Sequence, residues 1–153
     1  MDIKMVWTGL NGALECNKDI ETDEGLETAV ITSLFTDKRA PKGVELPAGE
    51  VRRRGWWGDS LLSYSDEYGS LLWLLCREKE TRNVVLRAEE YAKSALQWLI
   101  QDGVAKQIDV YGEIPSPGVL HLLVQIWRPG RNDSMSFKYA YNWKKQEVKP
   151  DAI

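Results

Sequence analysis

The stretch from Arg52 to Asp59 holds the side chains of this sequence that are best suited to recognition. It reads Arg-Arg-Arg-Gly-Trp-Trp-Gly-Asp, so three cations, two indoles and one carboxylate occur in a row. Guanidinium groups bind carboxylates and phosphates and stack on aromatic rings. Indoles bury a large apolar area and keep one N–H that needs an acceptor. The glycines on both sides of the Trp pair allow sharp turns. The stretch is therefore either a clamp between elements or a surface for another molecule.

Three interpretations of this stretch follow from its chemistry. In the structural one, Trp56 and Trp57 wedge between helix and sheet while the arginines pair with acids. In the assembly one, the same residues contact a neighbouring subunit, because Arg and Trp are common at the centres of interfaces. In the alternative, a nucleic-acid-binding module, the arginines hold phosphates while bases stack on the indoles. The cluster is short and the net charge is −3, which favours the first two interpretations, and these are compatible with each other.

No pattern for catalysis or metal binding stands beside this stretch. His121 is the single histidine, and a lone histidine on a strand is usually structural. Cys16 and Cys76 are the two cysteines, and neither has a fixed base near it in the sequence. The sequence lacks the metal-ligand clusters and the phosphate-cradling glycine loop of known motifs. We therefore expect no enzyme, no catalytic residues, no cofactor and no metal.

Length and composition indicate one soluble domain. The chain has 153 residues, of which 43% are hydrophobic and 28% charged, and a chain of this length can bury a real core. We expect no signal peptide, because no cationic region followed by an apolar run opens the chain. No segment approaches the ~20 apolar residues of a membrane span. Two cysteines make no disulfide framework, so we expect synthesis in a reducing cytoplasm.

Helical spacing predicts two main helices. Apolar residues recur from Leu26 to Leu34, with Thr22 or Asp23 as the expected cap and an end near Thr36. A longer amphipathic pattern runs from Thr81 to Asp102 and stops at Gly103. Ser70–Cys76 is apolar almost all round, which suits a buried helix or a buried strand, and we favour a helix that continues through Glu80. Residues 41–51 should form a loop that leads into the Arg/Trp stretch.

Alternating patterns predict strands at both ends of the chain. Asn11-Gly12 between short apolar runs indicates a small N-terminal hairpin within residues 1–20. Three strands should follow the long helix, at 104–111, 119–127 and 135–143, with a charged, loose tail over 144–153. Met135, Phe137, Tyr139, Tyr141 and Trp143 share one face of the last strand, and one sheet face could carry aromatics outward to a partner. The fold class is therefore α+β: a single domain, residues 1–153, with a three-stranded antiparallel meander packed against two main helices.

Four motifs in consistent order resemble the phage Mu gene-product-forty-six family of tail proteins. These are the run from Thr28 to Ala40 that ends in Thr-Asp-Lys-Arg-Ala, then RRRGWWGD, SLLWLLCREKET and YAKSALQWLIQDGVA. The resemblance covers about residues 20–130. More loosely, the order of elements is similar to that of the wedge, or sheath-initiating, baseplate proteins of other contractile tails.

This resemblance implies a structural subunit of a contractile phage or prophage tail baseplate. Such a subunit would sit around the central tube and spike, contact wedge, spike or tube neighbours, be oligomeric in the assembled tail, and have no catalytic activity. It would be made and assembled in the host cytoplasm and end in the virion, with no membrane or nucleic acid partner. The motif residues carried over as fold- or interface-forming are Thr36, Asp37, Arg39, Arg53, Arg54, Gly55, Trp56, Trp57, Gly58 and Asp59.

Overall fold

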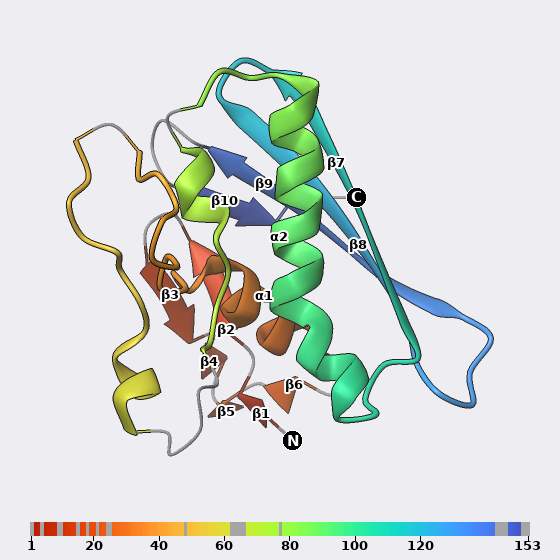
Figure 1. The fold of residues 1–153 in the computed structure, drawn as a ribbon. Helices are drawn as coiled ribbons and strands as arrows, with labels where there is room; N and C mark the ends of the chain where they lie inside the picture. The colour runs from red at the N-terminus through yellow and green to blue at the C-terminus, as the bar shows by residue number, and fades with distance from the viewer. Residues whose placement is uncertain are drawn as a thin grey trace.

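Two α-helices cover one face of an antiparallel sheet in the computed structural model (Figure 1). The structure describes residues 26–47, 49–61, 67–76 and 78–142, together with the backbone of short strands before and after them. The helices are α1 (Glu27–Phe35) and α2 (Arg82–Gln101), and the sheet contains β7 (Gln107–Ser116), β8 (Val119–Trp127), β9 (Ser134–Asn142) and β10 (Glu147–Pro150) in the order β10-β9-β8-β7. The predicted α+β class, the two main helices and the three-stranded meander are confirmed.

Helix α2 packs on the sheet through a stripe of small and branched side chains. Its buried residues are Val84, Ala88, Ala92, Leu96 and Leu99, which recur at helical spacing along one side. The small alanine side chains allow the helix to pack close to the sheet. Val85 is half-buried at the edge of the stripe, beside β7.

The aromatic side of β9 points into the core rather than outward. Tyr139 pairs with Leu122 and Tyr141 with Leu120 in the β8–β9 register, so the aromatic residues share the face of the buried leucines. The ring of Phe35, at the end of α1, lies 5.6 Å from that of Tyr139 and 6.0 Å from that of Tyr141. Burial raises the pKa of Tyr141 to about 12. The open aromatic face suggested by the alternation is therefore not present over 135–141, and Trp143 lies outside the described residues.

Short elements connect α1 to α2. The 3-10 helices η1 (Trp57–Leu61) and η2 (Leu72–Leu75) replace the loop and the longer helix that the sequence predicts there. All four residues of η2 are buried, which explains the apolar pattern, but the helix ends at Leu75 and does not continue to Glu80.

Helix α1 begins at Glu27, so neither Thr22 nor Asp23 caps it. No helix in the described ranges combines the length and apolar character that a membrane span requires.

The C-terminal segment differs from expectation, and the N-terminal one is described only in part. β10 adds a fourth strand to the sheet in the segment expected to be a loose tail. Near the N-terminus, β2 (Met5–Thr8) pairs antiparallel with β3 (Asn11–Leu14) where the hairpin is expected. The residues that join them are not described, so the hairpin stays a prediction. The remaining strand pairs join β1 (Asp2–Ile3) to β6 (Thr22–Asp23) and β4 (Cys16–Asn17) to β5 (Asp19–Ile20). The Cys16 side chain also lies outside the description.

Two glutamates, one on α2 and one just before it, accept hydrogen bonds from backbone N–H groups of the hairpin formed by β7 and β8. Glu89 on α2 accepts the N–H of Gly112 at 2.8 Å, and Glu80, just before α2, accepts the N–H of Gly118 at 2.6 Å. β7 is also longer than predicted and runs through the expected turn to Ser116. An unsatisfied strand edge is a template for unwanted pairing. Because the Gly112 N–H already donates to Glu89, it is not free to pair with a strand of another chain.

Gly112 sets how closely α2 approaches β7. A Cβ at this position would lie 2.9 Å from Cγ1 of Val85, and β-branched valine cannot turn away freely. We expect Gly112→Ala to lower the free energy of unfolding by about 1–3 kcal/mol, because overpacking outweighs the gain from a stiffer unfolded chain. Urea denaturation monitored by circular dichroism measures this. Val85→Ala removes the clashing methyl groups, so the double variant should lose less than the sum of the two single variants. Additive losses would mean that the two residues do not touch.

Candidate interface loop

The end of α1 forms a fixed corner over residues 36–40. The N–H of Ser70 donates to the carbonyl of Thr36 and the N–H of Lys38 donates to the carbonyl of Ser70, both at 2.9 Å. Gly69 precedes this contact with φ +101°, and a Cβ there would come within 2.3 Å of the Thr36 carbonyl oxygen. Only glycine permits such an approach. The Thr-Asp-Lys-Arg-Ala segment is therefore tied to the segment that leads into η2.

The loop that carries the Arg/Trp stretch, residues 50–61, is attached to this corner by its second and third arginines. The N–H of Ala40 donates to the carbonyl of Arg53 at 2.8 Å, and the Arg53 guanidinium donates back to the carbonyls of Ala40 and Pro41. Arg54 has φ +50°, an uncommon backbone conformation for a residue with a side chain. That conformation needs support from the surroundings, and the Arg54 side chain supplies it.

Arg54 is the centre of the contact between loop and corner. Its Nη1 donates to Asp37 at 2.9 Å, its Nη2 to Glu50 at 3.1 Å, and its guanidinium carbon lies 4.5 Å from the centre of the Trp73 ring. The Trp73 indole N–H in turn donates to the carbonyl of Lys38 at 2.9 Å. Burial acts to lower the pKa of Arg54, but the hydrogen bonds and charges of Asp37 and Glu50 outweigh it and raise that pKa. The side chain is therefore held as a cation between two carboxylates and one indole.

The second half of the loop is held by glycine and by Asp59. A Cβ on Gly58 would fall within 2.2 Å of the Trp56 ring, so Gly58 lets that indole lie flat on the backbone. The Trp56 ring centre is 5.4 Å from that of Tyr68, and Asp59 accepts the Tyr68 N–H at 3.1 Å. Gly55, with φ +116°, lies against Arg39, where a Cβ would come to 3.1 Å from the Arg39 Cβ. These contacts fix the turn on both sides of the Trp pair.

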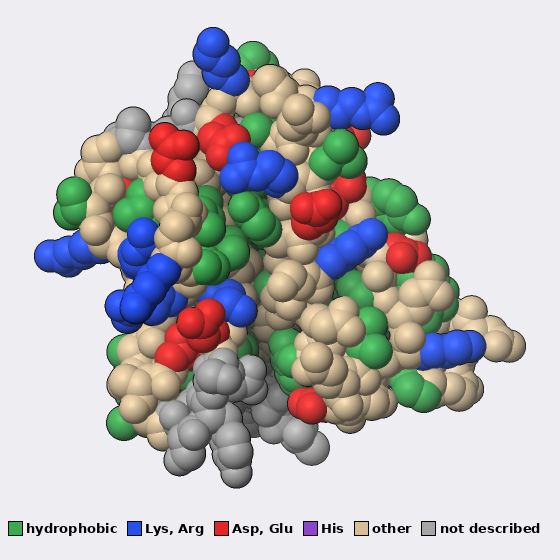
Figure 2. Space-filling view, viewed as in Figure 1, with side chains coloured by type: hydrophobic (Ala, Val, Ile, Leu, Met, Phe, Trp, Pro, Cys, Tyr) green, Lys and Arg blue, Asp and Glu red, His purple; other side chains and the backbone are tan. Residues whose placement is uncertain are grey.

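Three large apolar side chains of the loop point away from the protein. Val51 is 87% exposed, Trp57 73% and Leu61 73%; we call these three residues the exposed patch. Trp56, at 37%, lies at the margin between this patch and the interior. In Figure 1 the loop stands at the left of the molecule, away from the sheet, and Figure 2 shows mixed basic and acidic side chains over this side. Large contiguous apolar areas on a protein surface often mark contact sites, and these three exposed side chains belong to one loop, which makes the loop the candidate contact surface.

The structure thus separates the predicted site residues into two groups. Most of them build the loop or its corner: Thr36, Asp37, Arg53, Arg54, Gly55, Trp56, Gly58 and Asp59 all make internal contacts. Trp57 is exposed, and Arg39 is exposed beside Gly55. Sequence reasoning missed Glu50, Gly69, Ser70 and Trp73, which complete the attachment. Glu50 stands four residues before Arg54, but that spacing indicates a pair only within a helix, and this segment is a loop.

The loop leaves one of its three arginines exposed, and His121 lies on β8. Of the three consecutive arginines, Arg53 and Arg54 are used within the fold and only Arg52 is exposed. His121 lies on β8, on the face opposite the buried leucines, with its Nδ1 3.4 Å from a carboxylate oxygen of Glu113. Within the ranges that the structure covers, no group of three or more His, Cys, Asp or Glu side chains is placed to hold a metal ion.

The central role of Arg54 can be tested by measuring stability. We expect Arg54→Ala to lower the free energy of unfolding by about 2–3 kcal/mol, because it leaves Asp37 and Glu50 without their shared cation and uncovers Trp73. Arg52→Ala, on the exposed neighbour, is the matched control and should change stability by less than about 0.5 kcal/mol. Thermal and urea unfolding of both variants measure the difference. Equal effects of the two substitutions would contradict this account of the loop.

The loop should also give the stability a dependence on pH. The backbone N–H of Arg52, first, and the Arg54 side chain lower the pKa of Glu50 below its ordinary value of 4.5. A carboxyl group with a lowered folded pKa stabilises the fold above its unfolded pKa, and this contribution disappears as the pH falls through the folded pKa. We therefore expect the stability difference between the natural protein and Glu50→Gln to be largest near neutrality and to disappear as the pH falls below the lowered pKa of Glu50. Urea denaturation across this range measures it, and a constant difference would contradict the assignment.

Comparisons with known proteins agree on one family. The sequence pattern of the family described as phage protein GP46 matches residues 26–133, which include the corner, the loop, both helices and β7 and β8. The chain is 42% identical over 144 residues to a protein named baseplate protein gp46 from Escherichia phage Mu, covering 92% of this chain and 97% of that one. It is 38% identical over 146 residues to the Mu-like prophage FluMu protein gp46 of Haemophilus influenzae, covering 93% and 97%. By the extent of the family match and of these identities, this protein belongs to the phage protein GP46 family.

Proposed function

We propose that this protein is a structural subunit of the baseplate of a contractile phage or prophage tail, and that it acts by contacting other tail proteins. The relative from phage Mu, which bears the name baseplate protein, aligns over nearly the full length of both chains. Similarity across whole chains supports a shared role better than a shared motif does. The subunit would be made and assembled in the host cytoplasm and would end in the tail of the virion.

The observation that carries the contact role is the exposed patch on a rigid support. Val51, Trp57 and Leu61 are exposed to 87%, 73% and 73%, while the loop beneath them is held by Arg53, Arg54 and Asp59. A preorganised loop loses little conformational freedom when it binds, so more of its apolar contact area contributes to affinity. Trp is also the residue type most often found at the energetic centre of interfaces. The patch therefore serves as the docking surface for a neighbouring wedge, spike or tube subunit.

This proposal assigns the motif residues to different tasks. Arg53, Arg54, Gly55, Gly58 and Asp59 keep the loop in shape, and Trp57 makes contact with the neighbour. A catalytic task is not part of the proposal, because the polar groups of the loop are engaged with one another and with the corner. The protein would contribute to assembly through its shape and its apolar surface.

An assembly experiment tests this division. In a phage or prophage that carries the gene, we expect Trp57→Ala to reduce incorporation of the protein into purified tails by at least tenfold, in line with the loss of a central interface tryptophan (about 2 kcal/mol or more). The isolated variant should lose less than about 1 kcal/mol of stability, because the side chain is mostly exposed. Quantitative immunoblotting of tails and thermal unfolding measure the two effects.

Leu86→Ala is the matched control for this experiment. Leu86 is 46% exposed on α2, outside the exposed patch, so its truncation should leave tail incorporation unchanged. Normal tails with Trp57→Ala, or an equal defect with Leu86→Ala, would refute the docking role of the patch. Absence of the natural protein from purified tails would refute the baseplate role itself.

A further inference from the structure

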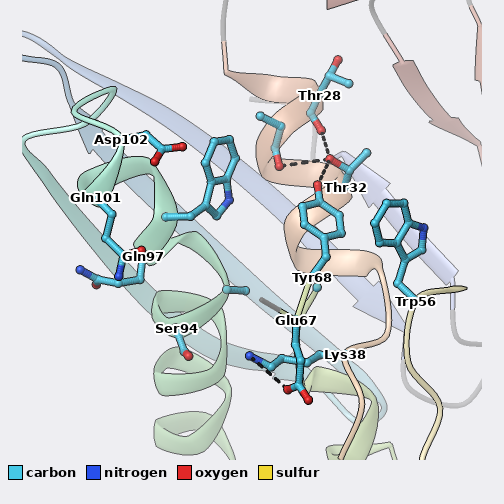
Figure 3. A pocket seen from close by; sticks show the side chains of 14 residues that line it. Thr28, Thr32, Lys38, Trp56, Glu67, Tyr68, Ser94, Gln97, Gln101 and Asp102 are labelled. Carbon is cyan, nitrogen blue, oxygen red and sulfur yellow. Dashed lines mark hydrogen bonds and ion pairs between the residues drawn. The ribbon is translucent and has the colours of Figure 1, made fainter. Parts of the chain in front are cut away.

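A pocket of about 650 Å³ lies between α1, α2 and the segment that follows the loop. Figure 3 shows Gln97, Gln101 and Asp102 of α2 along one side of it, with Tyr68 and Trp56 on the other. The Trp98 ring also lines it. The pocket therefore has three aromatic walls and one polar rim, and none of its lining residues belongs to the exposed patch.

The aromatic walls are fixed from behind. The Tyr68 hydroxyl donates to Thr32 Oγ1 at 2.8 Å, and Thr32 donates to the carbonyl of Thr28 at 2.8 Å. The Trp98 indole N–H donates to Ser33 Oγ at 3.0 Å. Because the polar atoms of these two rings are satisfied within the protein, the rings offer their apolar surfaces to an occupant. The walls are suited to a flat apolar or aromatic group.

The rim of the pocket favours a hydrogen-bond donor or a cation. Asp102 follows the last residue of α2, a helix of 20 residues that has no basic side chain in its last turn. The C-terminal end of a helix carries a partial negative charge, and Asp102 adds a full one. The charged pair at the opposite side, Lys38 and Glu67 at 3.8 Å, is neutral in sum. An occupant with an aromatic ring, an N–H donor and a nearby positive charge would match the walls and the rim together.

The loop of this same chain has that chemistry. Trp57 combines a large aromatic surface with an indole N–H, it is 73% exposed, and Arg52, on the same loop, is an exposed cation. Trp57 does not reach the pocket of its own chain, since it is not among the lining residues. Trp56 connects the two features: it lines the pocket, and its ring centre is 5.5 Å from that of Trp57. The projecting ring and the pocket are therefore neighbours on one surface.

We propose that two copies of this chain associate about a two-fold axis, with Trp57 of each copy inserted into the pocket of the other. A two-fold interface uses the same surface twice, so it requires that the donor group and the receiving pocket lie side by side. The arrangement of Trp57, Trp56 and the pocket meets this requirement. The inference rests on the proposed function, because it names a second copy of this chain as the neighbour that covers the exposed patch.

Sedimentation of the purified full chain tests the proposal. We expect the natural protein to show a concentration-dependent equilibrium between monomer and dimer, with Trp57→Ala weakening the dimer by at least about 30-fold. Gln97→Arg, an exposed pocket-lining position on α2, should weaken it similarly by obstructing the pocket. Leu86→Ala and Glu90→Arg change exposed α2 positions outside the pocket lining and should leave the dimer intact.

Mixing the two defective variants gives the sharpest result. Each variant alone lacks either both projecting rings or both open pockets. A mixture of Trp57→Ala with Gln97→Arg restores one ring facing one open pocket, so it should form a mixed dimer of intermediate affinity. Failure of the mixture to associate, or a natural chain that stays monomeric up to roughly 100 µM, would overturn the proposal.

This outcome is distinguishable from failure of the proposed function. If the natural chain is monomeric in solution but Trp57→Ala still prevents incorporation into tails, the patch contacts a different subunit and only the dimer is refuted. If the dimer forms as described but Trp57→Ala tails assemble normally, the dimer is confirmed while the docking role in tails is refuted.

Discussion

The arrangement of the loop depends on one guanidinium group, that of Arg54. It joins the end of α1 through Asp37, the beginning of its own loop through Glu50, and η2 through the face of Trp73. A planar cation with several fixed donors can satisfy two carboxylates and stack on a ring at once, which a lysine cannot do. The three segments that meet there are separate in the sequence. Without this contact the loop would lose its link to Asp37 and Trp73. It would keep the hydrogen bonds of Arg53 and Asp59 and the packing of Gly55 and Trp56.

Because Arg53 and Arg54 hold the loop to the corner, the loop keeps its shape although it exposes apolar side chains. The arginines that could have made a basic surface are turned toward carbonyls and carboxylates of the corner. The indole of Trp56 lies against Gly58, with its ring centre 5.4 Å from that of Tyr68, and Trp57 is left as the projecting ring. A rigid loop with one projecting aromatic is the form that a contact surface in a multi-subunit assembly requires.

The sheet, unlike the loop, buries most of its large apolar side chains in the core. β9 places its aromatic residues in the core, where Phe35 of α1 contacts them, and Glu89 and Glu80 satisfy backbone N–H groups of the β7 hairpin from within the chain. The apolar content of the sheet is therefore used for the fold. The exposed apolar side chains are instead concentrated on the loop, with Leu86, Val104 and Tyr111 as single exposures elsewhere among the described residues.

The sequence by itself determined the helices and the central strands, because periodicity of 3.6 or 2 records which side of an element is buried. It therefore predicted α1, α2 and β8 with their buried sides, and the motif identified the family. It could not determine the direction of the aromatic side of β9, because alternation separates two faces without saying which one a helix covers. It also could not divide the Arg/Trp stretch into supporting and exposed residues. That division depends on Asp37, Ser70 and Trp73, which come together only when α1 and η2 pack, and so the tertiary structure alone decided which tryptophan faces outward.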